Sequence, residues 1–170
     1  MHKHLQRLER SWVEPPIYFI TTCTEKRHSI LAQQPIAEIL LEEWRAAENR
    51  HGWLVGRYVI MPDHVHFFCA PCREAKSLSD FVGNWKRWTS RRIHALGEPG
   101  TARPGTTSPA TGRVGTRAPF GQAEFFDHLI RSDESYDEKW NYVRENPLRA
   151  GLVSSAELWP YAGEITALRR

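Results

Sequence analysis

Stretches rich in β-branched and aromatic residues recur along the chain and predict strands. Residues 17–24, IYFITTCT, follow two prolines and predict a first strand. Residues 53–61, WLVGRYVIM, and 64–70, HVHFFCA, predict a second and a third, separated only by Pro62 and Asp63. So short a connection predicts an antiparallel hairpin. Residues 124–131, EFFDHLIR, predict a fourth strand.

Apolar residues at helical spacing predict three longer helices. Residues 35–50 open with proline, keep one apolar face and end near His51 and Gly52. Residues 77–96 carry an apolar stripe, with Ser79 as the expected N-cap. Residues 135–152 form the last predicted helix, with Gly151 as its stop.

The predicted order is β-α-β-β-α-β followed by a further helix, which is the ferredoxin-like split βαβ plan. We therefore expect an α+β fold: one antiparallel sheet with helices on one face and an additional C-terminal helix. The length of 170 residues predicts a single domain over residues 1–170. Residues 97–121 are rich in Gly, Pro, Thr, Ser and Arg and predict a flexible loop.

Composition changes this picture only slightly. A net charge of +3 and an isoelectric point near 8.9 indicate mild attraction to polyanions. The first residues lack the apolar segment of a signal peptide, and no stretch approaches the roughly 20 apolar residues of a membrane helix. We therefore expect a cytoplasmic protein whose three cysteines are reduced thiols.

His64 and His66 form a His-x-His pair directly after the Pro-Asp turn. Because side chains alternate along a strand, both rings should lie on one face, about 7 Å apart, and Cys69 should lie on the other. Two imidazoles on one face can converge on a divalent metal. The alternatives are two solvent-facing histidines, or a structural zinc site with Cys69 and Cys72, which the alternation opposes.

The last predicted helix contains WNYVRENP, residues 140–147. If Tyr136, Trp140 and Val143 form its buried stripe, Tyr142 points away from the stripe and Asn146, one turn later, shares that side. This arrangement would present a phenol and an amide oxygen together. The alternative is a rim aromatic at Tyr142 and a simple capping residue at Asn146.

Basic and aromatic residues are interleaved in the second predicted helix. The candidates for DNA binding are Lys86, Arg87, Trp88, Arg91 and Arg92. Such a mixture suits phosphate contact and base stacking, and Glu98 is the only acid near these residues in the sequence. The alternative is a solvated helix face. No phosphate-binding Walker motif occurs, because GTARPGTT has threonine where lysine is needed, so ATP-driven chemistry is not expected.

Together, three segments resemble the REP-associated tyrosine transposases, relatives of the single-tyrosine HUH transposases. YVIMPDHVHFF resembles their HUH strand, FFDHLIR their fourth strand, and WNYVRENPLRAGLV followed by WPY their catalytic helix and C-terminal signature. The chain departs from the family at Gly121-Gln122, where relatives often have Trp-Gln, and along the Gly- and Pro-rich loop.

The resemblance implies a metal-dependent endonuclease and strand transferase that acts on single-stranded or hairpin DNA of the repeated extragenic palindrome type. Tyr142 would be the nucleophile, forming a 5′-phosphotyrosine, and His64, His66 and Asn146 would hold Mg²⁺ or Mn²⁺. It further implies a monomer acting in cis, with a dimer as the alternative, and association with the nucleoid when bound to DNA. Two other functions stay open: a catalytically inactive nucleic-acid-binding module on the same fold, and a zinc-stabilised structural protein.

Overall fold

The structure is a computed structural model that describes residues 15–97, 120, 125–130 and 133–168. Its elements, in chain order, are β1 (Ile17–Cys23), η1 (Glu25–Arg27), α1 (Gln34–Arg45), α2 (Ala47–His51), β2 (Trp53–Ile60), β3 (His64–Pro71), α3 (Leu78–Leu96), β4 (Phe126–Ile130), α4 (Asp133–Arg144), α5 (Asn146–Arg149), η2 (Ala156–Leu158) and β5 (Ala162–Glu164).

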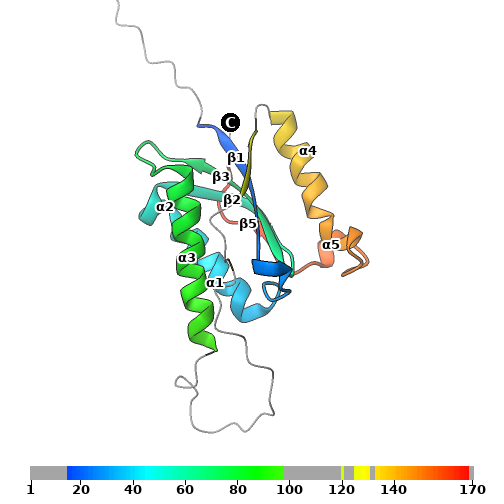
Figure 1. The fold of residues 1–170 in the computed structure, drawn as a ribbon. Coiled ribbons are helices and arrows are strands. Elements are labelled where there is room, and N and C mark those ends of the chain that lie inside the picture. The colour runs from blue at the N-terminus through cyan, green and yellow to red at the C-terminus, as the bar shows by residue number, and fades with distance from the viewer. Residues whose placement is uncertain (1–14, 98–119, 121–124, 131–132, 169–170) are drawn as a thin grey trace, which may run out of the picture.

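The strands form one antiparallel sheet in the order β4-β1-β3-β2-β5 (Figure 1). The predicted α+β class is confirmed, as is the order in which the first four strands follow one another along the chain. The sequence analysis missed β5, which pairs with β2 through Arg57 and Glu164. Three residues, Ala162–Glu164, are too few to show the alternation by which strands are recognised.

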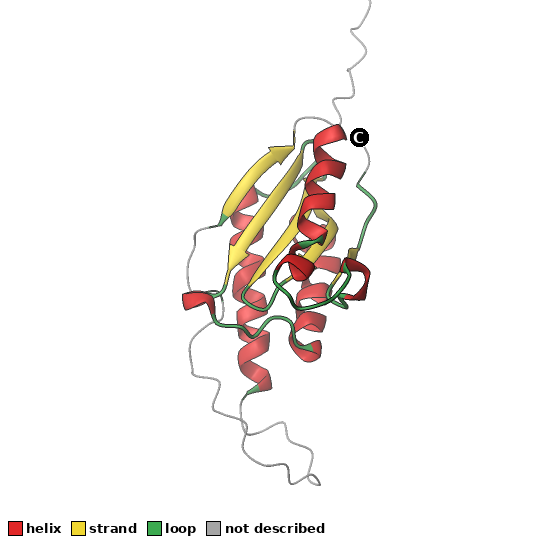
Figure 2. Ribbon diagram, turned by 90° about the vertical axis from the view of Figure 1, so that its right-hand side faces the viewer, coloured by secondary structure: helices red, strands yellow, loops and turns green. Residues whose placement is uncertain are grey.

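Helices cover both faces of the sheet, as Figures 1 and 2 show. On one face, which we call the α1–α3 face, Trp44 and Trp85 from the two helices pack against Phe67 of β3. On the other, the α4 face, Tyr136 and Val143 of α4 pack with strand residues that include Phe19 and Phe68. The two helices of the predicted split βαβ plan, α1 and α3, therefore share one face as expected, and the additional C-terminal helix, which the sequence did not assign to a face, lies on the other.

Local signals explain where the helices begin and end. The N-cap of α3 is Ser77 and not the predicted Ser79, because the Ser77 Oγ accepts the Asp80 N–H at 3.1 Å. Gly52 ends α2 with a φ of 74°, and a Cβ there would lie 2.8 Å from the Ala75 Cα. Glycine is therefore required at this stop.

Most of the predicted loop, residues 98–119 and 121, lies outside the described residues. Phe120 is described, and its buried ring lies 5.3 Å from that of Trp85. One apolar residue of this polar segment therefore belongs to the core of the α1–α3 face. Among the described residues, no helix combines the length and apolar character needed to cross a membrane.

Candidate active site

The turn between β2 and β3 positions the two histidines. Asp63 O accepts the Thr24 N–H at 2.8 Å, and Pro62 O accepts the Leu31 N–H at 2.8 Å. Both donors belong to the segment that follows β1, so this segment fixes the turn. The Met61 N–H donates to His64 O at 2.8 Å and closes the hairpin.

His64 and His66 lie on the same face of the sheet, as the alternation predicts. Their ring centroids are 4.8 Å apart. His64 Nδ1 lies 2.6 Å from Asp63 Oδ1, and His66 Nδ1 lies 2.8 Å from Thr21 Oγ1. In the tautomer with hydrogen on Nδ1, each ring keeps an Nε2 lone pair, and no hydrogen bond in the described part of the chain uses it.

The surroundings of His66 keep its ring neutral. Burial is the largest cause, and electrostatic interactions with His64, Lys139 and Arg27 add to it; together they lower the pKa of His66 from 6.5 to about 3. The ring also stacks on Phe19, with centroids 5.5 Å apart. A neutral imidazole with an oriented Nδ1 is the form that binds a metal ion. The two histidines therefore fit the implied divalent ion, as two of its ligands.

Cys69 lies on the opposite face, in the core between α1 and α3. Burial raises the pKa of its thiol well above the ordinary value, which makes it a structural residue and not a ligand. The zinc site with Cys69 and Cys72 is therefore wrong in geometry. The described residues include no cluster of three His, Cys, Asp or Glu side chains that could hold a metal.

Tyr142 lies on the exposed side of α4, as its helical position predicts. Tyr136 and Val143 are buried and Trp140 is partly buried, whereas 64% of the Tyr142 side chain is exposed. Tyr142 lines a shallow pocket of about 400 Å³ between α4 and β4, with residues that include His128 and Lys139.

Arg149 is a residue of this site that the sequence analysis missed. Its guanidinium lies 4.2 Å from the Tyr142 ring centroid and donates to Tyr142 O at 2.6 Å and to Asn146 Oδ1. Tyr142 and Asn146 therefore share one arginine. The sequence could have indicated this contact, because Arg149 follows Asn146 by three residues and such residues are neighbours on a helix. The capping alternative for Asn146 is wrong, because the N-cap of α5 is Glu145.

Lys139 lies between the tyrosine and the histidines. Its Nζ is 4.8 Å from the centroid of Phe19, the ring that stacks on His66. Among the described residues, no hydrogen bond, ion pair or ring contact joins Tyr142 or Asn146 directly to either histidine. Tyr142 and the two histidines thus lie on the α4 side of the sheet, and Asn146 is joined to Tyr142 through Arg149.

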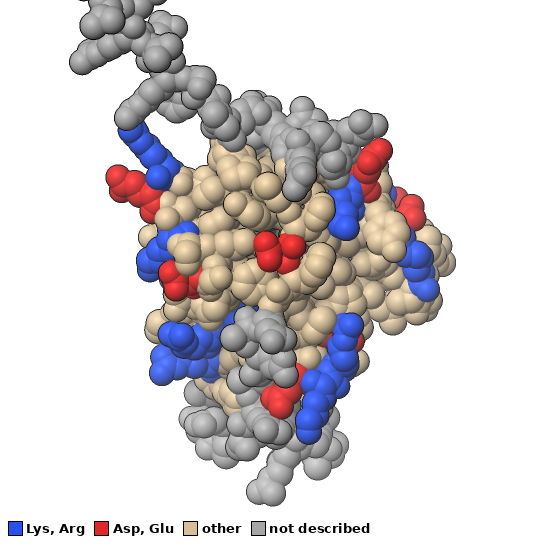
Figure 3. Space-filling model, turned by 45° about the horizontal axis from the view of Figure 1, so that its top comes forward, with Lys and Arg blue, Asp and Glu red and all other residues tan. Residues whose placement is uncertain are grey.

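The predicted DNA-binding residues of α3 have different surroundings from one another. Lys86 is buried, and Arg92 pairs with Glu42 and Glu43 of α1. Arg87 and Trp88 are exposed, as is Arg91, whose guanidinium lies 5.4 Å from the Trp88 ring centroid. Their role in DNA binding stays a prediction, narrowed to these exposed side chains. On the face seen in Figure 3, basic and acidic side chains are scattered, and the described residues form no continuous basic stripe.

The WPY signature of the sequence braces the end of β2. Trp159 Nε1 donates to Ile60 O at 3.0 Å, and the Ile60 N–H donates to Tyr161 O at 2.8 Å. Ile60 comes one residue before the turn that carries Asp63. The signature therefore has a structural role beside the candidate site.

Comparisons with known proteins found a matching family and two similar folds. Residues 14–101 match the family described as "Transposase IS200 like". A REP-associated tyrosine transposase of Escherichia coli K12 is 22% identical over 109 residues, which cover 64% of this chain and 52% of the relative. The chain thus spans about half the length of that curated relative.

Two solved structures share the fold. One is a REP-associated tyrosine transposase bound to a REP hairpin, with a TM-score of 0.62 and 18% identity over 93% of this chain and 82% of that one. The other, from Deinococcus radiodurans R1, is described as a candidate transposase; it has a TM-score of 0.51 and 19% identity over 82% of this chain and 96% of that one. At these identities, both matches show the fold.

Proposed function

The chain belongs to the IS200-like transposase family, and from that premise we propose that it cleaves and rejoins single-stranded DNA at hairpins through Tyr142. One observation carries the proposal: an exposed tyrosine on α4 shares a sheet face with two imidazoles whose Nδ1 atoms are already held. A REP hairpin is what the similar solved structure binds. We extend that class of substrate to this chain.

In the proposed reaction, the Tyr142 hydroxyl oxygen attacks the scissile phosphorus. A bond forms between this oxygen and phosphorus, and the bond from phosphorus to the 3′ oxygen breaks. The phenol loses a proton and the leaving oxygen gains one, which gives a 5′-phosphotyrosine and a free 3′-OH. Because one phosphodiester replaces another, the step is near balanced and reverses without ATP.

His64 and His66 would hold a divalent metal ion, Mg²⁺ or Mn²⁺, through their Nε2 atoms, with Asn146 as third ligand. When bound, the ion polarises the scissile phosphate and stabilises its developing charge. Asn146 Oδ1 accepts a hydrogen bond from Arg149 in this structure, so it would have to leave Arg149 to serve as a ligand. Asp63 and Thr21 would orient the rings throughout.

Positively charged side chains lie beside the two histidines and beside Tyr142, and they would bind the DNA backbone. Lys139 and Arg27 both act on His66 electrostatically, from α4 and from η1. Arg149 lies on the Tyr142 ring itself. The exposed Arg87, Trp88 and Arg91 of α3 are proposed contacts for the hairpin stem on the opposite face, where phosphate contacts would set affinity but not sequence.

The test is covalent capture of a labelled DNA hairpin with Mg²⁺ or Mn²⁺, read on a denaturing gel. Tyr142→Phe should abolish the adduct. Tyr136→Phe is the matched control, because Tyr136 is buried against Phe68 on the same helix and should leave the adduct unchanged. An adduct that survives in Tyr142→Phe would refute the assignment of the nucleophile.

The inactive binding module gives a different result in the same experiment. It binds the hairpin with steep salt dependence and gives no adduct with any divalent metal. One observation supports the inactive module. The hydrogen bond from Arg149 occupies Asn146 Oδ1, the oxygen that a metal ion would need. Arg149→Ala should therefore raise the affinity for Mn²⁺ if Asn146 is a ligand.

A further inference from the structure

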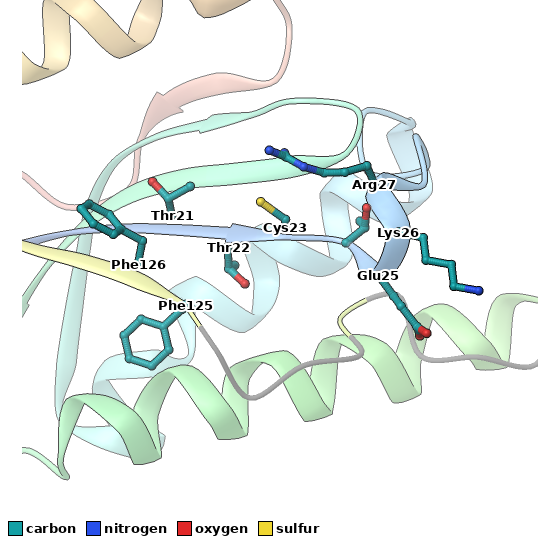
Figure 4. Close-up of a pocket in the computed structure, with 9 residues that line it drawn as sticks. Thr21, Thr22, Cys23, Glu25, Lys26, Arg27, Phe125 and Phe126 are labelled. Carbon is teal, nitrogen blue, oxygen red and sulfur yellow. The ribbon is translucent and has the colours of Figure 1, made fainter.

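We infer that a second pocket, where β1 ends, binds the single-stranded DNA next to the scissile phosphate, with a base on Phe126 and a backbone phosphate on Arg27. This inference rests on the proposed function. The pocket has a volume of about 610 Å³ and is lined by residues 21–27 and 125–126, and we call it the β1 pocket (Figure 4). None of the site residues predicted from the sequence lines it.

Among the described residues, the strand pairing explains why this end of β1 has no neighbouring strand on the β4 side. β4 pairs with β1 only as far as Thr21, opposite Phe126, so the last residues of β1 extend past the start of β4. Lys26 and Arg27 then adopt φ values of 51° and 57°, a left-handed conformation that non-glycine residues rarely hold. Figure 4 shows the result: the Arg27 side chain extends back over Cys23 toward Thr21.

The exposed side chains on the side of β1 that carries Thr21 and Cys23 suit a nucleotide. Phe126 is 63% exposed, a large aromatic surface of the kind on which unpaired bases stack. The Arg27 side chain is 60% exposed and carries a guanidinium suited to phosphate oxygens. Glu25, the acidic residue of the pocket, points to the other side of β1 (Figure 4).

Two hydrogen-bonded paths connect the β1 pocket to the histidines. Thr21 lines the pocket and lies 2.8 Å from His66 Nδ1. Arg27 donates to Asp63 Oδ2 at 3.3 Å, and Asp63 Oδ1 lies 2.6 Å from His64 Nδ1. A strand that occupies the pocket is therefore adjacent to both imidazoles, and its phosphate would compete for Arg27 with the carboxylate that orients His64.

The first experiment measures binding of a fluorescent DNA hairpin with a short single-stranded foot, whose bases are replaced one at a time by abasic sites. Wild type should lose affinity by about fivefold to 150-fold at one position of the foot, the range for a stacked base. Phe126→Ala should lose this dependence and Phe126→Trp should keep it. Leu129→Ala is the control: Leu129 is also exposed on β4, but its side chain lies on the other face.

The second experiment measures the salt dependence of the same binding. Arg27→Gln should reduce the slope of log affinity against log salt by about 0.7, the value for one phosphate of a single strand. Arg73→Gln is the control, because Arg73 is exposed beyond the far end of β3. Equal slopes for Arg27→Gln and wild type would overturn the phosphate assignment.

These results are independent of whether the DNA is cleaved. If no variant forms a tyrosine adduct and Phe126→Ala still removes the abasic-site dependence, the β1 pocket stands and the cleavage proposal fails. If the adduct forms and Phe126→Ala binds every abasic hairpin as wild type does, the pocket is refuted and the cleavage proposal stands.

Discussion

The two faces of the sheet use one strand for different purposes. β3 directs Val65, Phe67 and Cys69 into a fully buried core on the α1–α3 face. The same strand directs His64 and His66 toward the α4 face, where Phe68 completes a smaller apolar cluster. On the first face, Trp44 and Trp85 stack 5.3 Å apart above the strand.

The difference between the faces follows from the cost of burying polar groups. Polar ring atoms buried on the α1–α3 face lose their hydrogen bonds to water: in the described part of the chain the indole N–H groups of Trp44 and Trp85 have no partner, whereas that of Trp53 donates to Lys76 O at 2.9 Å. On the α4 face, Thr21 and Asp63 satisfy one nitrogen of each imidazole and leave the other for a ligand. Stability is therefore concentrated on one face and chemistry on the other, and substitutions should separate the two.

Phe67→Ala should have the largest effect on stability. Phe67 is completely buried on the α1–α3 face, so the substitution should lower the free energy of unfolding by about 3–5 kcal/mol. Denaturant unfolding measures this, with the exposed Phe126→Ala as control, expected to change it by less than about 0.5 kcal/mol. A loss of under 1 kcal/mol, well below the range for buried Phe, would show that this face is not the main core.

His66→Gln should have the next largest effect, and on cleavage instead of stability. Glutamine can keep a hydrogen bond to Thr21 but lacks the imidazole ligand. Removing one group that stabilises transition-state charge typically costs about a hundredfold to a thousandfold in rate, and we expect a loss of that size in single-turnover adduct formation. Wild-type rates in His66→Gln would contradict the assignment of the active face.

The pH dependence of the free energy of unfolding should be a smaller effect than the two substitutions above, and it should also arise from the α4 face. Above pH 6.5, His66 is neutral in the folded and unfolded states. As the pH falls from 6.5 toward the folded pKa of about 3, only the unfolded chain gains the proton, so the folded state loses stability. The loss between pH 6.5 and 5 should be about 1–2 kcal/mol, at up to about 1.4 kcal/mol per pH unit.

This pH effect is best measured as a difference between two proteins. Urea unfolding in the presence of a chelator, at several pH values, should show a shallower acid loss for His66→Gln than for wild type. Parallel curves would mean that the folded protein does not hold His66 neutral.

Cys69→Ala should have the smallest effect on metal binding. Because the thiol is buried on the α1–α3 face, its removal should leave Mn²⁺ and Zn²⁺ affinities within about twofold of wild type, well under the tenfold or greater loss typical even of metal-site outer partners. Equilibrium dialysis followed by metal analysis provides the measurement. Loss of tightly bound zinc would restore the structural-zinc alternative.

Short-range patterns in the sequence determined the first four strands, the longer helices and the direction of the paired side chains, but not the three-residue β5. Alternation by twos put both histidines on one face and Cys69 on the other. Helical spacing left Tyr142 exposed while Tyr136 and Val143 were buried. These features depend only on residues a few positions apart, which a single sequence displays directly.

Contacts between distant segments were decided by the tertiary structure alone. Glu42 and Glu43 of α1 neutralise Arg92, although Glu98 is the only acid near it in the sequence. Thr21 orients His66 across two strands, and α4 crosses to the face opposite α1 and α3. Nothing local encodes such partners, because the free energy that selects them is that of packing the whole sheet. The placement of α4, which carries Tyr142, on the same face of the sheet as the two histidines of β3 is therefore a property of the whole fold.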